Sequence, residues 1–164
     1  MHYINHCSSP LGKITLASNG NELIGLWFEG QKYFGSTLNG EYKQKRLPVF
    51  EQTAKWPDIY FSGKNPDFTP PLFLSSTSFR NEVWKILLTI PYGKIMTYGE
   101  IAKLMAENRG VEKMSAQSVG GAVGHNPISI IVPCHRVVGT DGSLTGYAGG
   151  VDIKEKLLKI ENAL

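Results

Sequence analysis

Cysteine is scarce in this chain of 164 residues, which has only Cys7 and Cys134. A small secreted protein held together by disulfides normally carries more cysteines, so we expect both thiols to be reduced. No stretch approaches the roughly 18 consecutive apolar residues that a membrane-spanning helix needs. The first residues also lack the basic start and the apolar run of a signal peptide. We therefore expect a soluble cytoplasmic protein without membrane contact, and a monomer.

Charge of one sign is also lacking, since the formal net charge is only +3. Residues 1–75 carry seven Lys and Arg against six Asp and Glu, and residues 76–164 carry ten against eight. Neither half shows the concentrated basic footprint that by itself indicates nucleic-acid binding. Charge therefore leaves the kind of partner open.

Strand patterns come first along the chain. The apolar runs Ile14–Ala17 and Leu23–Phe28 flank a turn sequence at 18–21, which predicts a hairpin. Apolar residues from Leu47 to Phe61 are compatible with a helix, although Pro57 argues against an unbroken one. Prolines and small residues then predict a boundary within 70–78, which divides the chain into domains 1–75 and 76–164.

Helix patterns dominate the second half. Apolar residues keep helical spacing from Phe79 to Ile90, behind capping candidates at 76–78. Thr97 and Glu100 have the spacing of a capping box, which predicts a second helix from Tyr98. The last helix is expected to open with Asp152-x-x-Glu155. The predicted fold class is α+β, with a small N-terminal antiparallel sheet and helix followed by a mostly helical C-terminal domain.

A third helix in this half is expected from Ser115, its N-cap, to Gly124. Together with the helix that opens at Tyr98 it suggests a helix-turn-helix, in which 115–124 is the recognition helix. An ordinary helical hairpin fits the same pattern. The stretch has no charge and mostly small side chains, and its two adjacent glycines each cost about 1 kcal/mol of helix propensity. That cost favours a packing or docking reason for them.

One short sequence combines groups suited to nucleophilic chemistry. The apolar run Ile128–Val132 predicts a buried strand or extended segment, which Pro133 ends just before Cys134, His135 and Arg136. The thiolate is the nucleophilic form of cysteine, and neighbouring basic groups favour it. His135 is a candidate base, although adjacent residues on a strand point to opposite faces, so a direct bond would need a turn or a bridging water. Glu161 is a candidate to orient His135. An inert buried cysteine, a surface histidine and a solvated glutamate are the alternatives.

The wider pattern around this cysteine resembles the O6-alkylguanine-DNA alkyltransferases. The similarity rests on Pro-Cys-His-Arg-Val at 133–137, Gly-His-Asn-Pro at 124–127 and Gly-Tyr-Ala-Gly-Gly at 146–150, and it extends from about Phe79 to Glu161. It implies direct, irreversible transfer of an alkyl group from O6-alkylguanine in double-stranded DNA to the protein, one lesion per molecule. O4-alkylthymine is a further candidate substrate. No cofactor and no metal are expected, and residues 1–75 are expected to form a ribonuclease H-like domain.

The resemblance also implies roles for residues of the reaction centre. Cys134 is the expected alkyl acceptor, activated by His135 and Glu161 through a water. Tyr98 matches the tyrosine that gives a proton to the departing base, a role suited to a hydroxyl of pKa about 10. Asn126 matches the hinge asparagine of the family.

Other positions are expected to contact DNA. Tyr147 lies where the family forms a wall of the guanine pocket, and Ala148 stands where some relatives have serine, which puts one hydrogen bond to the substrate oxygen in question. The damaged base must leave the duplex, and a helix of small residues suits close approach to the narrow minor groove. Where the family typically has an arginine that fills the vacated gap, this chain has Gln117. The expected DNA-binding set is completed by Ser115 and Ala116 at the start of the helix and by Arg136. If Gln117 is merely exposed to solvent, Arg136 or Arg109 is the alternative candidate for filling the gap.

Three other functions remain open on the sequence. A non-catalytic lesion-binding protein would lack the acceptor, so Cys134 argues against it. A turnover cysteine hydrolase would use the same three residues, Cys134, His135 and Glu161, but release its product. A regulator that senses alkylation would need a further DNA-binding domain, which this length does not accommodate.

Overall fold

The computed structural model describes residues 1–164, which divide into two compact units. Unit 1 consists of Met1–Leu74 together with Pro127–Ser129, and unit 2 consists of Ser75–Asn126 and Ile130–Leu164. The short segment 127–129 thus belongs to unit 1, although the residues on both sides of it belong to unit 2. None of the helices is long and apolar enough to cross a membrane.

Unit 1 is built on a four-stranded sheet in the order β3-β2-β1-β4. Its strands are β1 (His2–Ser9), β2 (Gly12–Ser18), β3 (Leu23–Phe28) and β4 (Tyr42–Gln44). The predicted hairpin is confirmed as the antiparallel pair β2–β3, which pairs Ile14 with Phe28. β1 and β2 are also antiparallel, whereas the short edge strand β4 runs parallel to β1.

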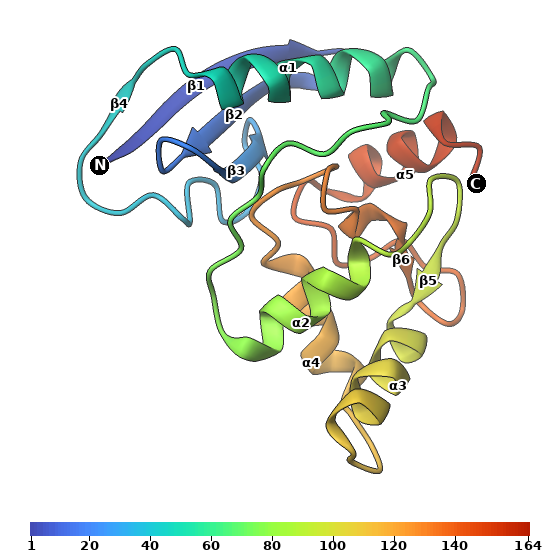
Figure 1. Ribbon diagram of the computed structural model, residues 1–164. Helices are drawn as coiled ribbons and strands as arrows, with labels where there is room; N and C mark the ends of the chain where they lie inside the picture. Colours follow the sequence, from blue (N-terminus) through green and yellow to red (C-terminus); the bar gives the residue numbers. More distant parts are fainter. The chain divides into compact units, whose positions relative to one another are not determined.

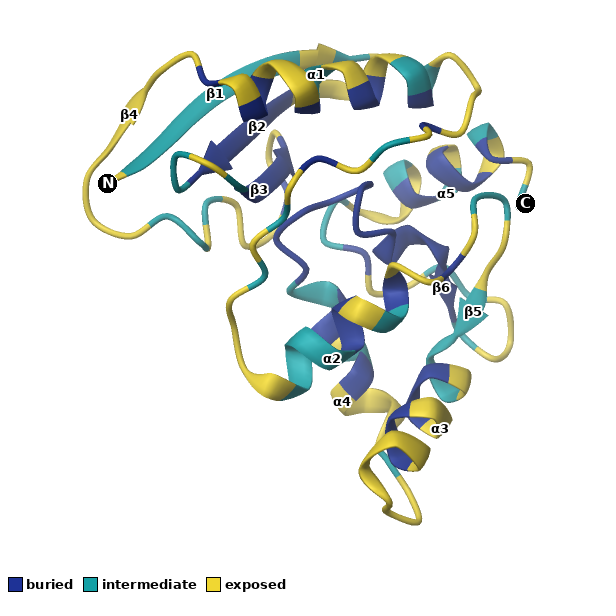
Figure 2. Cartoon of the chain, in the orientation of Figure 1, coloured by how far each residue is buried: buried dark blue, intermediate teal, exposed yellow.

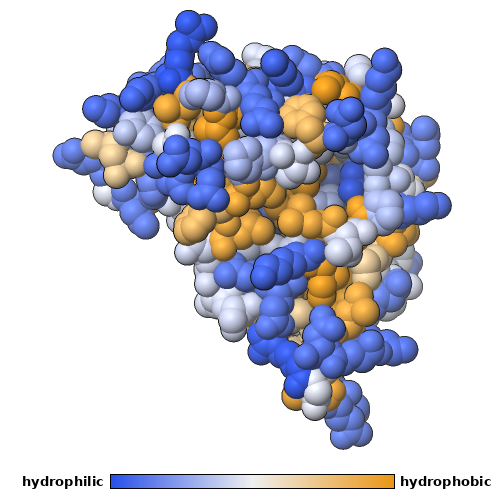
Figure 3. All heavy atoms as spheres, in the orientation of Figure 1, coloured by the Kyte–Doolittle hydropathy of each residue, from blue (hydrophilic) through white to orange (hydrophobic).

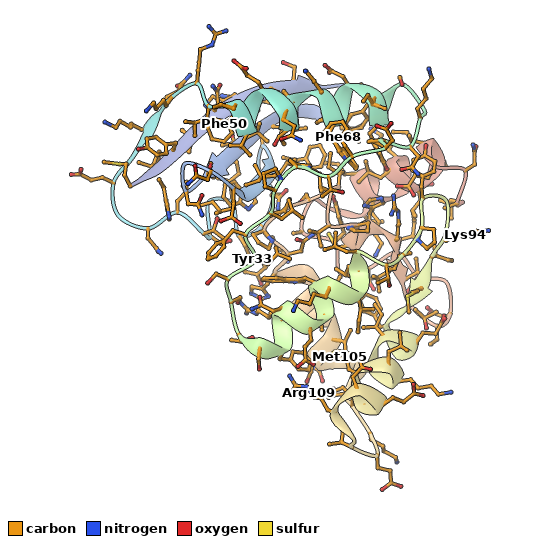
Figure 4. All side chains as sticks on the ribbon, in the orientation of Figure 1. Tyr33, Phe50, Phe68, Lys94, Met105 and Arg109 are labelled. Carbon is orange, nitrogen blue, oxygen red and sulfur yellow. The ribbon has the colours of Figure 1, made fainter.

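Helix α1 (Pro48–Phe61) packs on the sheet of unit 1 and turns its buried face toward the strands (Figures 1 and 2). The expectation that Pro57 interrupts this helix is wrong, because Pro57 lies inside it and is buried. A proline within a helix costs about 3 kcal/mol, but burial of an apolar face against a sheet can outweigh that local cost. Phe50 and Trp56 are among the buried side chains of this face, and Figure 4 labels Phe50.

The segment Pro127–Ser129 pairs with β3 inside unit 1. The amide of Leu26 donates to the carbonyl of Pro127 at 2.9 Å, and the amide of Ser129 donates to the carbonyl of Leu26 at 3.0 Å. The expected buried strand or extended segment over 128–132 is wrong in its length, since only Ile128 forms a bridge and the chain then turns at Ile130, which has φ +60°. The run is buried as expected, because apolar side chains fill a core in a turn as well as in a strand.

Unit 2 contains four helices and a short parallel pair of strands. The elements are α2 (Ser78–Leu87), β5 (Met96–Thr97), α3 (Tyr98–Arg109), α4 (Ala116–Gly124), the 3₁₀ turn η1 (Cys134–Arg136), β6 (Val137–Val138) and α5 (Val151–Ile160). The indole nitrogen of Trp84 on α2 donates to the carbonyl of Ala122 on α4 at 2.8 Å. This bond links α4 to α2.

The helix starts of unit 2 follow the local chemistry of the chain. Thr97 accepts a bond from the amide of Glu100, whose carboxylate accepts one from the amide of Thr97, so the predicted capping box is confirmed. Ser115 caps α4 by accepting from the amide of Ser118 at 3.2 Å, also as predicted. The expected opening of α5 by an Asp152 cap is wrong. Gly150 occupies the N-cap with φ +96°, a conformation that favours glycine, and no side chain caps this helix.

Candidate functional site

The 3₁₀ turn η1 holds both the predicted nucleophile and the predicted base, which are buried in unit 2. Cys134 is 4% exposed and His135 is fully buried. Because the turn replaces an extended strand here, the two side chains are not forced to opposite faces. The ring of His135 has its Nε2 atom 2.6 Å from Oε2 of Glu161, so the predicted pairing of these two residues exists in the structure.

The tautomer of His135 follows from this bond. An ionised carboxylate only accepts, so Nε2 of His135 donates to Glu161, and Nδ1 is the accepting nitrogen of the neutral ring. Burial lowers the pKa of His135, and the hydrogen bond and charge of Glu161 oppose that effect. A neutral imidazole with its accepting nitrogen fixed by a carboxylate is the form that a general base requires.

Glu161 is held as a carboxylate by a ring of donors. Arg136 donates from Nε at 2.8 Å and from Nη2 at 3.2 Å, and the amide of Gly93 donates at 2.9 Å. Burial by itself would raise the pKa of Glu161, but the hydrogen bonds from His135 and Arg136 and the positive charge of Arg136 lower it to about 2. Glu161 therefore stays charged throughout the neutral range.

Arg136 lies in the interior, an environment unlike that of a side chain free to reach DNA. It is 7% exposed, and its Nη1 donates to the carbonyl of Ile90 at 2.7 Å in addition to the two bonds to Glu161. Arg109, the other arginine considered for the gap in DNA, ends α3 (Figure 4) and makes two bonds to Glu82, at 2.9 and 3.2 Å. Its guanidinium also lies over the ring of Phe79.

Cys134 combines deep burial with neighbours that favour its anion. Burial raises its pKa to about 11, against the opposing effects of a hydrogen bond from Asn126, the charge of Lys154 and backbone amides. Asn126 also donates from Nδ2 to the carbonyl of Val132 at 2.8 Å. This bond fixes the side chain of Asn126 against the backbone two residues before the thiol. Polar groups are therefore arranged around a thiol that the protein interior keeps neutral at rest.

Tyr98 stands at the start of α3, and its hydroxyl donates to the carbonyl of Thr145 at 2.8 Å. Burial raises the pKa of Tyr98 to about 12, with a further contribution from the charge of Cys134. Gly146 has φ +89°, and a Cβ there would lie 2.6 Å from the tyrosine oxygen. Only glycine leaves room for the hydroxyl at this point of the loop.

A cavity of about 430 Å³ opens beside this tyrosine. It is lined by residues of α3, α4 and the loop at 139–146: Tyr98, Gly99, Ala116, Gln117, Gly120, Gly139, Thr140, Thr145 and Gly146. Ser115, Ala116 and Gln117 are exposed at the start of α4. On the face that Figure 3 shows, hydrophilic side chains gather over the tip where α3 ends.

The loop after β6 places the remaining predicted residues. Tyr147 is buried, and its ring meets the ring of His135 edge-on, with the two centroids 6.5 Å apart. Ala148 is half-buried. The structure thus groups Tyr147 with His135, whereas Gln117 and Ala116 line the cavity beside Tyr98.

Sequence reasoning missed two contributors to this site, Gly93 and Lys154. Gly93 acts through its backbone amide, which carries no signal in a sequence. Lys154 is fully buried on α5, although lysine is seldom buried. It lies three and four residues before the buried Leu157 and Leu158, which places it within the apolar stripe of the helix. This spacing in the sequence could have predicted that Lys154 is buried.

Comparison with known proteins assigns the chain to a family. Residues 78–163 match the family model described as 6-O-methylguanine DNA methyltransferase, DNA binding domain, and residues 2–74 match that described as 6-O-methylguanine DNA methyltransferase, ribonuclease-like domain. The chain belongs to the 6-O-methylguanine DNA methyltransferase family.

Named relatives agree with this assignment over nearly their whole length. The methylated-DNA–protein-cysteine methyltransferase of Methanosarcina barkeri is 43% identical over 160 residues, which are 97% of this chain and 96% of the relative. The protein of that name from Mycobacterium tuberculosis is 41% identical over 163 residues, covering 99% and 93%. The crystal structure of Mycobacterium tuberculosis OGT in complex with DNA superposes with a TM-score of 0.84 at 40% identity and covers 98% of this chain and 93% of that one.

Proposed function

We propose that this protein repairs DNA by moving the alkyl group of O6-alkylguanine onto Cys134 in a single, irreversible step. The observation that carries the proposal is the 2.6 Å bond from His135, which shares the turn η1 with the thiol, to Glu161 at the end of α5. The names of the relatives and the DNA complex of a 40% identical protein support the same reaction. Units 1 and 2 would then be the ribonuclease-like domain and the DNA-binding, alkyl-acceptor domain.

The reaction begins with loss of the thiol proton. His135 takes it at Nδ1, by way of a water, and Glu161 stabilises the imidazolium that forms. The sulfur of Cys134 then bonds to the alkyl carbon while the bond from that carbon to O6 breaks, and its electron pair passes to guanine. Tyr98 gives its hydroxyl proton to the departing base, which is a poor leaving group as an anion.

Helix α4 supplies the DNA contact in this proposal. Its exposed start and its glycines give a face without long side chains, as close approach to the minor groove requires. Gln117 fills the gap that the flipped base leaves in the duplex. The flipped base lies beside Tyr98, with Tyr147 and Ala148 of the loop after β6 forming a wall and Asn126 holding the acceptor segment.

Turnover is not expected. The product is a thioether, which has no easy leaving group, so each molecule repairs one lesion and needs no cofactor. Both cysteines are free in the structure, in keeping with a reducing compartment, and we place the protein in the cytoplasm.

Mass spectrometry of the protein after mixing with methylated duplex tests the function. The expected product carries one added methyl group, localised to Cys134 by fragmentation, and the yield stops at one per protein molecule. Repeated release of product would indicate a turnover hydrolase instead. Tight binding of the lesion without any change in protein mass would indicate a lesion-binding protein. A duplex with O4-methylthymine in a parallel reaction defines the substrate range.

A further inference from the structure

Two asparagines in this chain are followed by glycine, Asn19 and Asn39, and the structure holds the two pairs differently. Such a pair is chemically labile, because the backbone amide nitrogen of the glycine can attack the side-chain carbonyl of the asparagine. Glycine has no Cβ to hinder this approach, and it gives the backbone the freedom to make it. Both pairs lie in unit 1, outside the residues of the proposed reaction.

The Asn19–Gly20 pair is fixed by the turn between β2 and β3. Oδ1 of Asn19 accepts from the amides of Asn21 and Glu22, at 3.1 and 2.9 Å, and its Nδ2 donates to Oε1 of Glu22 at 3.4 Å. The amide of Gly20, which would be the attacking group, donates to Oγ of Ser18 at 2.9 Å. The side chain cannot turn toward this nitrogen unless several hydrogen bonds break together.

The Asn39–Gly40 pair has none of these restraints. Both residues are exposed and lie outside the strands, in the connection that enters β4 (Figures 1 and 2). The backbone amide of Asn39 donates to Nδ1 of His2 at 3.2 Å, but the side chain of Asn39 and the amide of Gly40 form no hydrogen bond in the structure. The attacking nitrogen and the carbonyl carbon are therefore free to meet.

We propose that Asn39 is a modification site, at which the protein deamidates itself through a cyclic imide. The nitrogen of Gly40 bonds to Cγ of Asn39, the bond from Cγ to the side-chain nitrogen breaks, and ammonia leaves with the proton of the Gly40 amide. Water then opens the ring. Cleavage at Cγ gives aspartate, and cleavage at the main-chain carbonyl carbon gives isoaspartate.

Both products change the edge of the sheet in unit 1. Either one adds a carboxylate, which lowers the formal net charge by one, from +3 to +2. Isoaspartate also moves one methylene from the side chain into the main chain. The added atom falls between Leu38, which packs against the buried cluster around Trp27, and Tyr42, which pairs with His2. The exposed connection between these two anchored residues has to absorb it.

Peptide mapping of the folded protein by mass spectrometry tests the proposal, with Asn19 of the same molecules as the internal control. The full chain is incubated for several days at pH 7.5 in water enriched in heavy oxygen, so that a product formed during the incubation carries one oxygen atom from the solvent. The same chain unfolded in guanidinium chloride reports the reactivity of both pairs without structure. Asn39→Gln, whose longer side chain would have to close a larger ring, is the matched variant that should stay unmodified.

In the folded protein we expect Asn39 to deamidate about 10- to 100-fold faster than Asn19, the effect of the hydrogen bonds that hold the turn. In the unfolded chain the two rates should become similar, since both pairs are then free. The rate at Asn39 should rise about tenfold per pH unit, because attack requires the deprotonated amide of Gly40. Ser18→Ala removes the acceptor of the Gly20 amide and should raise the rate at Asn19 alone.

Three results would overturn the assignment. Equal rates at Asn39 and Asn19 in the folded protein would mean that the turn gives no protection. A rate at Asn39 far below that in the unfolded chain would mean that the fold protects this pair as well. Aspartate without isoaspartate at position 39 would exclude the cyclic imide. Should Ser18→Ala fail to fold, the comparison of the folded with the unfolded wild type decides the same question.

Discussion

The two cysteines of this chain have similar pKa values in opposite surroundings. Burial raises the pKa of Cys7 on β1 and of Cys134 on η1 to about 11. The charge of Asp58 contributes to the rise at Cys7. Around Cys134, by contrast, Asn126 and Lys154 act against burial.

This difference shows that the raised value alone does not identify a nucleophile. Burial suppresses the anion at both sites, but only Cys134 has neighbours that stabilise the anion once a base removes the proton. Only Cys134 also adjoins a histidine oriented by a carboxylate. The two cysteines are therefore distinguished by the residues around each thiol, and these residues can be substituted one at a time.

The largest effect is expected from Cys134→Ala, which should abolish alkyl transfer while DNA binding stays nearly intact. The thiol is the acceptor, whereas docking rests on α4. Loss of transfer is measured by protein mass after mixing with methylated duplex, and retained binding by a gel-shift titration. A methyl group that appears on Cys7 instead would overturn the comparison between the two thiols.

Tyr98→Phe is expected to slow transfer by about 10²- to 10⁴-fold, the range for loss of general-acid help. The ring remains to pack, so the variant should fold. Single-turnover kinetics on duplex substrate measure the effect, with Tyr92→Phe as a control, since that hydroxyl donates to the carbonyl of Ile160. A wild-type rate would show that Tyr98 has only a structural part.

Glu161→Gln should lower the free energy of unfolding by about 3–5 kcal/mol at pH 7, because it leaves buried Arg136 without its charged partner. The folded-state pKa of Glu161, about 2, lies below its ordinary 4.5. Its carboxylate therefore stabilises the fold above pH 4.5, and this contribution is lost as the pH falls toward 2. Urea unfolding over that range should show the wild type converging on the variant. Glu155→Gln, in an exposed pair with Lys159, should cost less than about 1 kcal/mol.

Gln117→Ala is expected to slow repair of methylated duplex several-fold, roughly the scale of one lost polar contact, and to leave the reaction with free O6-benzylguanine unchanged. The free base needs no flipping, which costs a few kcal/mol in a duplex. Gln117→Arg should repair duplex at least as fast as wild type. The slope of the logarithm of the binding constant against the logarithm of the salt concentration should become steeper by about one. Equal losses on both substrates would indicate a pocket role, and no loss on either would retire the gap-filling role of Gln117.

The smallest effect should come from Cys7→Ser, which we expect to leave the rate of methyl transfer unchanged. Cys7 is held in β1 opposite Ile14, and it has no histidine and carboxylate arranged as at Cys134. The rate is measured on the same duplex as for the other variants. A large fall in the rate of methyl transfer without loss of folded protein would mean that Cys7 also takes part in the reaction.

Elements defined by local chemistry were predictable from the sequence. The capping box at Thr97, the cap at Ser115 and the β2–β3 hairpin depend on residues within a few positions of one another. The pairing of His135 with Glu161, by contrast, was reached only as a candidate, because it joins residues 26 positions apart.

The features that sequence reasoning missed depend on tertiary packing. Pro57 is carried inside α1 because the apolar face of that helix outweighs the local cost of a proline. The turn at Ile130 cannot be distinguished from a strand by an apolar run alone. The interior place of Arg136 and the backbone bond from Gly93 follow from where Glu161 lies, which no local pattern gives.

The pairing of Pro127–Ser129 with β3 has a consequence for how the chain folds as it is synthesised. Unit 1 is discontinuous in sequence, so the first 74 residues leave the ribosome without the segment that pairs with Leu26. Until residue 129 emerges, that edge of β3 keeps unsatisfied backbone groups, which are a template for pairing with other chains. A nascent chain that pauses between residues 74 and 127 should therefore be more prone to aggregate than the finished protein.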